Sequence, residues 1–387
     1  MKKKQLKKNK IVYLVNALGL DGTSQVVMTI FKHFQAEYEL HVITLNQKRE
    51  VLRNVILPSS VYVHSFNISE DTDYSLISYL RNLFFVNRWR VKYRKVIDLI
   101  QVLNPAIIHA HLQPRELMII HALKKVERFK LLYTDHSLRI KRDDYRWLNR
   151  QLLAWVYRRI YRIFNVVAVS KQVYDYHVHF NLIGRRKFHK LIVNRVNTEY
   201  FVPSSHALTK PIRVIYVARL HQKKGHDTLI KAWSLIKHSF SLELILVGGG
   251  DDEARLKQLH LDVGSAHPIT FKGDVTDVLA YLQSSDIGVF PSLNEGLPIS
   301  LLEKMSCGLP VIVSNIPEFK EIINDNENGL FFEAGNFKEL AQKLNLLIAD
   351  SSLRKRLGES ARQVVVENYS QPEFKIAYQN IYNLLLS

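Results

Sequence analysis

The sequence predicts an α/β protein built from two doubly wound domains, and three observations support this prediction. The chain has 387 residues, enough for two domains of ordinary size. Short runs rich in Val, Ile and Leu alternate with helical segments, which is typical of parallel sheets covered on both faces. This alternation stops at a polar segment with two prolines, residues 202–211, and then starts again.

In the first half, we expect parallel strands at 11–18, 39–45, 106–112, 130–136, 165–170 and 190–196. Several of these runs are almost continuous in apolar residues, as expected for strands buried on both faces. Helices are expected between them at 25–35, 91–103 and 116–126. Strands and helices in this order predict one doubly wound sheet.

The second half repeats the pattern, with short apolar strands that end in Gly, Arg, Pro or Ser. We therefore predict an N-terminal Rossmann-like domain over 1–205 and a C-terminal Rossmann-like domain over 206–371. Residues 372–387 have apolar side chains at helical spacing. We expect them to form a helix that packs back on the N-terminal domain.

Charge is distributed unevenly along the chain. The net charge is +18, and residues 1–200 carry 35 Lys and Arg against 15 Asp and Glu, which leaves the remainder at −2. Such asymmetry indicates an anionic partner for the first half. Cys307 is the single cysteine, so no intrachain disulfide can form and a reducing compartment is expected. No apolar run reaches the length of a membrane-spanning helix.

One segment, VFPSLNEGLPISLLEKMSCGLPVIVS, places two acidic residues at a turn from a strand into a helix. Glu295 lies in the loop after the strand, and Glu303 lies about one turn inside the helix. The free N–H groups at such a helix start favour binding of phosphate. A plain capping role for the acidic pair is the alternative interpretation.

Two cations follow the first strand of the second half. Arg219 and Lys224 could neutralise a diphosphate at this edge without a metal ion. The alternative is that they are ordinary surface cations. The glycines at 248–250 either let the backbone approach a ligand or serve a structural turn.

The order of these blocks is similar to that of glycosyltransferase family 4, also called group 1. Residues 295–303 resemble its signature of two glutamates separated by seven residues. Its remaining blocks resemble, in order, residues 217–233, 244–256, 269–292, 308–323 and 326–332. The resemblance is strong over 212–335 and weaker, though collinear, over 10–200.

This resemblance implies a GT-B fold, in which two Rossmann-like domains face each other across a cleft. It also implies a nucleotide-sugar donor held by the second domain, retention of anomeric configuration, and no metal or other cofactor. Among the catalytic residues it implies, Arg219 and Lys224 should hold the diphosphate, and Glu295 should contact the sugar or its phosphate side. Glu303 should bind the ribose. Further donor contacts are expected at Val275, Leu297, Pro298 and Ile299.

The first domain contributes four further residues. Gly19 and Gly22 lie between the first strand and its helix, where the family approaches the diphosphate and acceptor. His111 ends a strand and matches a family histidine near the reacting sugar, so we expect it to be catalytic. His136 matches a second common histidine near the sugar or acceptor.

Two basic and aromatic stretches, 81–95 and 139–164, predict contact with an anionic bilayer surface. The alternative is a solvated basic face with its aromatic side chains turned to the core. No nucleic-acid motif accompanies these stretches, so we expect no nucleic-acid partner.

We therefore expect a retaining glycosyltransferase on the cytoplasmic face of a membrane. It would use a nucleotide-sugar donor, UDP-linked by preference, and a glycan acceptor carried on a lipid, in surface polysaccharide biosynthesis. Two alternatives remain: a transferase of the same fold with a small soluble phosphorylated acceptor, or a noncatalytic nucleotide-sugar-binding protein.

Overall fold

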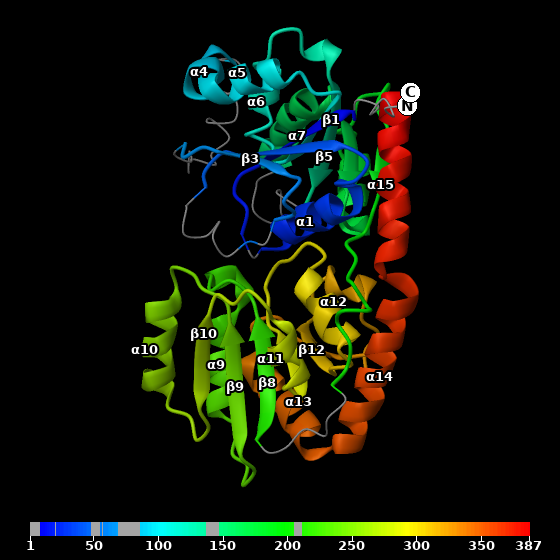
Figure 1. The fold of residues 1–387 in the computed structure, drawn as a ribbon. Helices are drawn as coiled ribbons and strands as arrows, with labels where there is room; N and C mark the ends of the chain where they lie inside the picture. Colours follow the sequence, from blue (N-terminus) through cyan, green and yellow to red (C-terminus); the bar gives the residue numbers. More distant parts are fainter. Residues whose placement is uncertain are drawn as a thin grey trace, which may run out of the picture. The chain divides into compact units, whose positions relative to one another are not determined.

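The computed structural model describes residues 8–19, 21–47, 55, 57–68, 86–136, 147–204 and 211–387. The chain divides into two compact units, Met1–Val193 with Lys375–Ser387 and Asn194–Phe374. Each unit is an α/β domain built on its own parallel sheet (Figure 1). The predicted fold class is therefore confirmed.

The sheet of the first unit has seven parallel strands among the described residues, in the order β3-β2-β1-β4-β5-β6-β7. Their bounds are β1 Lys10–Val15, β2 Glu39–Thr44, β3 Tyr62–Ser65, β4 Ile107–His111, β5 Lys130–Asp135, β6 Asn165–Ala168 and β7 His189–Leu191. The strand order reverses between β1 and β4, which are neighbours in the sheet. Ligands bind at such a switch point, beyond the carboxyl ends of the strands.

The helices of the first unit connect these strands. Their bounds are α1 Gly22–Phe34, α4 Val86–Lys92, α5 Arg94–Leu103, α6 Met118–His121, α7 Trp147–Tyr161 and α8 Lys171–His179. The helix expected at 116–126 forms only as α6, because the amides of Met118 and Ile119 bond to carbonyls three residues back and favour turns. The helix expected at 91–103 is interrupted at Tyr93.

The last helix, α15 (Gln371–Leu386), supplies core residues to the first unit. Tyr378 and Tyr382 are fully buried there. The Tyr382 hydroxyl lies 2.8 Å from the Tyr13 hydroxyl of β1 and 3.0 Å from Nδ1 of His109 in β4. The Tyr378 hydroxyl lies 3.2 Å from Oγ1 of Thr134 in β5. Segments from the two ends of the chain therefore share one hydrogen-bonded core.

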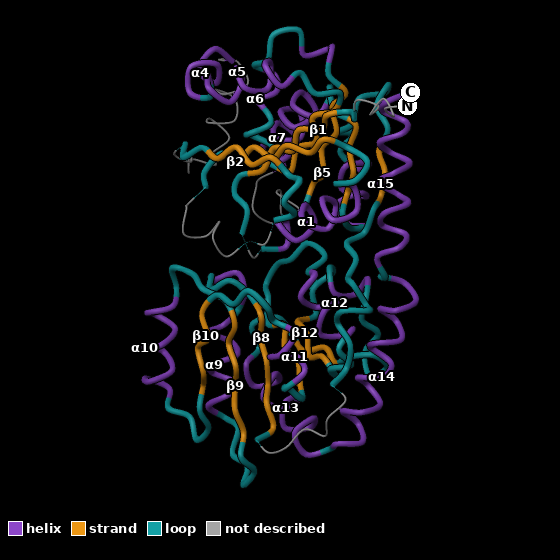
Figure 2. The backbone as a smooth tube through the Cα atoms, in the orientation of Figure 1, coloured by secondary structure: helices purple, strands orange, loops and turns teal. Residues whose placement is uncertain are grey.

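The described residues of the second unit form six parallel strands in the order β10-β9-β8-β11-β12-β13. Their bounds are β8 Ile212–Val217, β9 Leu242–Val247, β10 Ile269–Gly273, β11 Ile287–Phe290, β12 Val311–Ser314 and β13 Leu330–Phe332. Figure 2 shows β10, β9 and β8 running side by side. This order again reverses at one place, between β8 and β11.

The helices of the second unit are α9 His226–Ser234, α10 Glu253–Val263, α11 Leu279–Gln283, α12 Ile299–Ser306, α13 Phe337–Ala349 and α14 Ser351–Asn368. Helix α12 is buried along almost its whole length, and α14 packs closely against its end. A Cβ atom at Gly358 of α14 would lie 2.1 Å from the carbonyl oxygen of Gly308. This close approach fixes the position of α12 beside the sheet.

Candidate functional site

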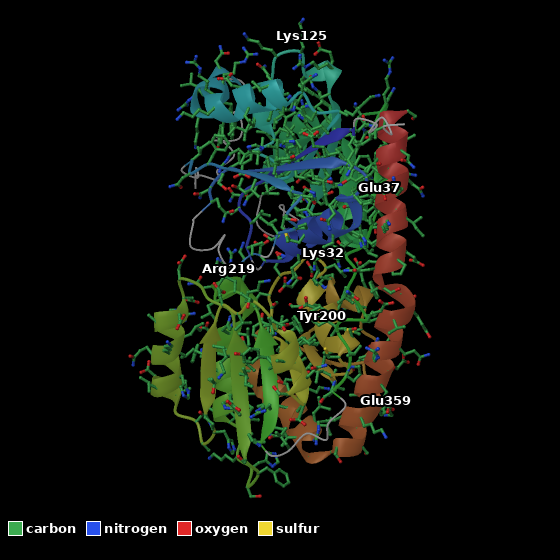
Figure 3. All side chains as sticks on the ribbon, viewed as in Figure 1. Lys32, Glu37, Lys125, Tyr200, Arg219 and Glu359 are labelled. Atoms are coloured by element: carbon green, nitrogen blue, oxygen red, sulfur yellow. The ribbon has the colours of Figure 1, made fainter. Side chains whose placement is uncertain are left out.

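The second domain gathers its predicted residues at its switch point. Arg219 lies two residues beyond β8, and Glu295 lies in the loop beyond the neighbouring strand β11. Arg219 is exposed, and Figure 3 shows it at the carboxyl end of the strands of this domain. The loops from β8 and β11 therefore meet at the edge where parallel sheets bind ligands.

Lys224 and Glu295 form an ion pair across these two loops. The Lys224 Nζ atom lies 2.7 Å from each carboxylate oxygen of Glu295. The loop that carries Lys224 turns at Gly225, which has a φ of 70°. A Cβ atom at this glycine would lie 1.9 Å from the carbonyl oxygen of Pro291, so only glycine allows the two loops to pack.

Ser292 and Tyr216 form hydrogen bonds that hold the two loops of this ion pair. The buried Ser292 hydroxyl donates to Oε1 of Glu295 over 2.6 Å and lies 2.9 Å from the Tyr216 hydroxyl. Tyr216 also donates to the carbonyl oxygen of Lys224 over 2.9 Å. Burial and the nearby Glu295 charge raise the pKa of Tyr216 well above its ordinary value. Tyr216 therefore stays a neutral hydrogen-bonding group that fixes both loops.

Glu303 lies on α12, just beyond the same loop. Its side chain is only 4% exposed. Helix α12 starts after Pro298 without a side-chain cap, so the amide groups of its first turn can bond to other acceptors. Asn194 fixes the approach to this helix, since its Nδ2 atom donates to the carbonyl oxygen of Leu297 over 2.7 Å. Ile299 is buried at the first helical position.

Two predicted elements of the second domain lie beside this cluster. Val275 follows β10, and its half-buried side chain packs against a core cluster that includes Ile215 and Leu282. Gly248 packs on the chain after β8, where a Cβ atom would lie 2.2 Å from the carbonyl oxygen of Ala218. For the glycine turn at 248–250, this contact favours the structural interpretation over approach to a ligand.

In the first domain, the loop before α1 is held by short-range hydrogen bonds. Asp21 caps the helix by accepting from the Ser24 amide over 3.1 Å, and the Gly19 amide donates to the Ser24 hydroxyl over 2.9 Å. The helix begins at Gly22, three residues earlier than expected. Gln47 holds the start of the loop through two hydrogen bonds with the backbone of Leu18. The backbone of this loop is therefore pinned on both sides.

His111 and His136 come together at the carboxyl ends of β4 and β5. The Nδ1 atom of His111 lies 2.8 Å from Nε2 of His136. Burial, together with the neighbouring His109 and His136, lowers the pKa of His111 well below its ordinary value. Within the described part of the chain, the buried Nε2 atom of His111 has no hydrogen-bond partner. His111 is therefore a neutral imidazole with one nitrogen available.

In the described parts of the two basic stretches, aromatic and cationic side chains differ in burial. Trp89 and Tyr93 are buried, as are Tyr157 and Tyr161 of α7. The cations of α4 and α5 are instead exposed: Arg88, Arg90, Lys92, Arg94 and Lys95. These observations agree with a basic face whose aromatic side chains turn to the core. The segments 81–85 and 139–146 lie outside the described residues.

No group of His, Cys, Asp and Glu side chains in the described ranges has the arrangement of a metal site. No described helix is both long and apolar enough to cross a membrane.

Sequence reasoning missed several residues that support the site, notably Asn194, Tyr216, Ser292 and Lys304. Tyr216 and Ser292 lie within predicted strand ends, where an apolar run gives no sign of a hydroxyl network. Lys304 was indistinguishable from a surface lysine, yet it is fully buried. No sequence signal marks this burial, because half of the residues of α12 (ISLLEKMS) are polar or charged.

Parallel sheets of this strand order bind ligands at their switch points, so fold and site together define a two-domain α/β protein with a candidate ligand site in its second domain. The chain matches the family model for glycosyl transferases group 1 over residues 199–364 and that for Glycosyltransferase Family 4 over residues 20–199. It belongs to this glycosyltransferase family, and its fold is GT-B.

Solved structures agree with the fold. HepE of Anabaena, in complex with UDP and glucose, is 19% identical with a TM-score of 0.78, covering 98% of this chain and 100% of that one. A glycosyltransferase of Rickettsia africae ESF-5 is 20% identical with a TM-score of 0.70, covering 98% and 99%. At these identities the likeness shows the fold alone.

Curated relatives match over a shorter range. The N,N'-diacetylbacillosaminyl-diphospho-undecaprenol alpha-1,3-N-acetylgalactosaminyltransferase of Campylobacter jejuni is 30% identical over 205 residues, 53% of either chain. The N-acetyl-alpha-D-glucosaminyl L-malate synthase of Bacillus anthracis is 26% identical over 203 residues, 52% of either chain. The chain spans about half the length of these curated relatives.

Proposed function

We propose that this protein is a retaining glycosyltransferase that moves a sugar from a UDP-sugar to a glycan acceptor carried on a lipid, in surface polysaccharide biosynthesis. The observation that carries the proposal is the ion pair of Lys224 and Glu295 at the switch point of the second domain. Support also comes from the family to which the chain belongs and from the Campylobacter jejuni relative, whose name includes a diphospho-undecaprenol.

Positive charge at this edge suits a departing nucleoside diphosphate. A lysine ammonium has three N–H donors, so Lys224 can keep both Glu295 oxygens and still donate to a phosphate. The exposed Arg219 offers a planar set of donors that matches phosphate geometry. These two cations would stabilise the charge that develops as the sugar–phosphate bond breaks. The backbone amides of Leu297 and Ile299 at the start of α12 would add donors.

The proposed reaction is front-face substitution. The diphosphate leaves, the sugar passes through a state like an oxocarbenium ion, and the acceptor hydroxyl attacks from the same side. The departing phosphate takes the proton of that hydroxyl. His111 would contact the sugar or acceptor as a neutral hydrogen-bonding group rather than as a nucleophile. Glu295 would position the sugar, and Glu303 would accept from the ribose hydroxyls.

A donor screen tests this function. Purified protein would be incubated with a panel of UDP- and GDP-sugars and with undecaprenyl-diphosphate-linked glycans, and transfer would be followed by mass spectrometry. We expect transfer from one UDP-sugar, with an anomeric configuration in the product, measured by NMR, that matches the donor. Binding of UDP without hydrolysis or transfer from any donor would instead favour a noncatalytic binding protein.

A small soluble acceptor is the second candidate. The Bacillus anthracis relative is named N-acetyl-alpha-D-glucosaminyl L-malate synthase, and malate is a small soluble hydroxy acid. The screen therefore includes sugar phosphates and hydroxy acids. Transfer to these acceptors at a higher kcat/KM than to the lipid-linked glycans would replace the lipid-linked proposal.

We further propose that the basic face of α4 and α5 holds the protein on the cytoplasmic surface of an anionic membrane. Its exposed cations are joined by Lys124, Lys125 and Arg128 after α6, of which Figure 3 labels Lys125. Arg90 donates to the carbonyl oxygen of Ala122 at the end of α6 and so links the two segments. Each such cation contributes on the order of 1 kcal/mol near an anionic surface.

Vesicle co-sedimentation tests the membrane proposal. We expect binding to vesicles with 30% phosphatidylglycerol, roughly an ordinary anionic content, and little binding to neutral vesicles. Reversing the charge of Lys92, Arg94 and Lys95 together should abolish it. Reversing Lys231, Lys237 and Lys338, which are exposed on the second domain, is the matched control. Equal binding to both vesicle types would overturn the proposal.

A further inference from the structure

Lys304 is a lysine with no exposed surface, one residue after Glu303 in α12. Its Nζ atom lies 4.3 Å from the centre of the Phe290 ring and 3.4 Å from the carbonyl oxygen of Ser300. Among the described residues it forms no ion pair within 4 Å. A buried ammonium with so few partners is costly, so its presence requires a reason.

The fold makes room for this side chain. Gly288 lies in the centre of β11, and a Cβ atom there would lie 2.8 Å from Cδ of Lys304. The aromatic ring under the ammonium belongs to Phe290, the last residue of the same strand, which leads directly into the loop of Ser292 and Glu295. Strand β11 therefore provides both the space for the Lys304 stem, at Gly288, and the aromatic ring beside its ammonium, at Phe290.

The charged and titratable groups around Lys304 come from three elements. Glu303 lies on its own helix, Cys307 caps the end of that helix, and Glu295 lies in the loop after β11. Helix α14 brings Arg362, which donates to the carbonyl oxygens of Ser306 and Phe201. Burial raises the pKa of the Cys307 thiol to about 12, so this group is neutral. Two carboxylates therefore dominate the charge that faces the ammonium.

Burial lowers the pKa of Lys304 to about 7, and Glu303, Cys307 and Glu295 oppose that shift. Burial therefore makes this ammonium lose its proton more readily than an exposed lysine does. Added negative charge nearby would favour the protonated form, because opposite charges attract strongly where water is excluded.

We propose that Lys304 is a positioning residue of the donor site, and that it takes up a proton from solvent when a nucleoside diphosphate binds beside Glu295 and Glu303. The inference rests on the proposed donor site of the second domain. The protonated ammonium would balance the two carboxylates from behind, so that they can lie next to an anionic ligand. Lys224 and Arg219 would contact the ligand, whereas Lys304 would act through the glutamates.

Calorimetric titration of the full chain with UDP tests this coupling. Titrations at pH 8 in two buffers with different ionisation enthalpies report the protons taken up on binding. We expect the parent protein to take up about 0.5 to 0.9 proton, and its affinity to fall by up to about tenfold per pH unit between pH 7 and 9. Lys304→Met should bind UDP more weakly and lose both effects. The pH window lies above the titration of the UDP phosphate, near pH 6.

Lys338→Met removes an exposed lysine of α13 and should behave as the parent. A purely structural role for Lys304 would change the melting temperature and leave proton uptake intact, and that result would overturn the inference. If Lys304→Met does not fold, a parent protein that takes up no proton on binding UDP overturns it equally. A parent that binds neither UDP nor GDP would instead refute the donor site on which the inference rests.

Discussion

The Lys224 ammonium and the Glu295 carboxylate lie 2.7 Å apart at both oxygens, although 71 residues separate them along the chain. The Glu295 side chain is 8% exposed and that of Lys224 is 29% exposed. The carboxylate is therefore the enclosed partner, and the lysine is the one that a ligand can reach. Because the two side chains differ in exposure, mutation of Lys224 can test contact with a ligand separately from mutation of Glu295.

Replacement of Lys224 by Met should weaken UDP binding by about 30-fold or more, because it removes the phosphate donor and leaves Glu295 buried without its cation. Isothermal titration calorimetry at pH 7.5 measures the change. Lys223→Met, at an exposed neighbouring position, is the control and should bind as the parent. Parental affinity in Lys224→Met would remove this residue from the donor site.

Replacement of Glu303 by Ala should remove discrimination between ribose and deoxyribose. The parent should prefer UDP to 2′-deoxy-UDP by about tenfold, since the loss of one charge-assisted hydrogen bond costs about 1.5–3 kcal/mol. Competition binding with both nucleotides measures the preference. Glu359→Ala, at the exposed position labelled in Figure 3, should keep it. An unchanged preference in Glu303→Ala would contradict the ribose assignment.

The buried His109 should make stability depend on pH. Burial lowers its pKa in the folded state well below its ordinary value, so the unfolded chain takes up the proton first as pH falls. Stability should therefore decline below about pH 6.5, by up to about 1.4 kcal/mol per pH unit for this histidine.

Urea denaturation at pH 7, 6 and 5 measures that decline. His109→Gln should be less stable at pH 7, since it disturbs the bonds to Tyr382 and Thr134, and it should lose less stability on acidification. His179→Gln, on the exposed side of α8, should follow the parent curve. The same pH slope in His109→Gln and parent would show that this group does not titrate on unfolding.

Gly288 and Lys304 should be energetically coupled. In the parent, Gly288→Ala should destabilise the protein by about 1–3 kcal/mol, because the new methyl group meets the lysine stem. In a Lys304→Ala background the same change should cost much less. A double-mutant cycle by urea denaturation gives the coupling. Equal costs in both backgrounds would mean that other neighbours, such as Val311, set the penalty.

The sequence predicted the two sheets well because buried parallel strands leave nearly continuous apolar runs. It failed at 116–126, where the apolar residues Leu117–Ile120 are buried on all sides and their spacing does not favour one helical face. Strand β3 was missed because its residues Tyr62–Ser65 are short and partly exposed at the edge of the sheet.

For the site, individual residues were more predictable than their contacts. Arg219, Lys224, Glu295 and Glu303 were expected in one donor site because the blocks that carry them resemble those of glycosyltransferase family 4. The ion pair of Lys224 with Glu295 was not expected, since it depends on how two loops pack at Gly225 and Pro291. The role of Tyr216 was equally hidden, because a tyrosine in an apolar run predicts only a core position.

The tyrosines of α15 also have a consequence for biosynthesis. A ribosome releases the residues of the first sheet early, yet Tyr378 and Tyr382, which contribute to its core, emerge only after the whole second domain. The core of the first domain can therefore be completed only after the whole second domain has been translated. A stop codon just before Tyr378 should therefore give a polypeptide whose first domain lacks part of its core and exposes apolar surface that cellular chaperones and proteases recognise.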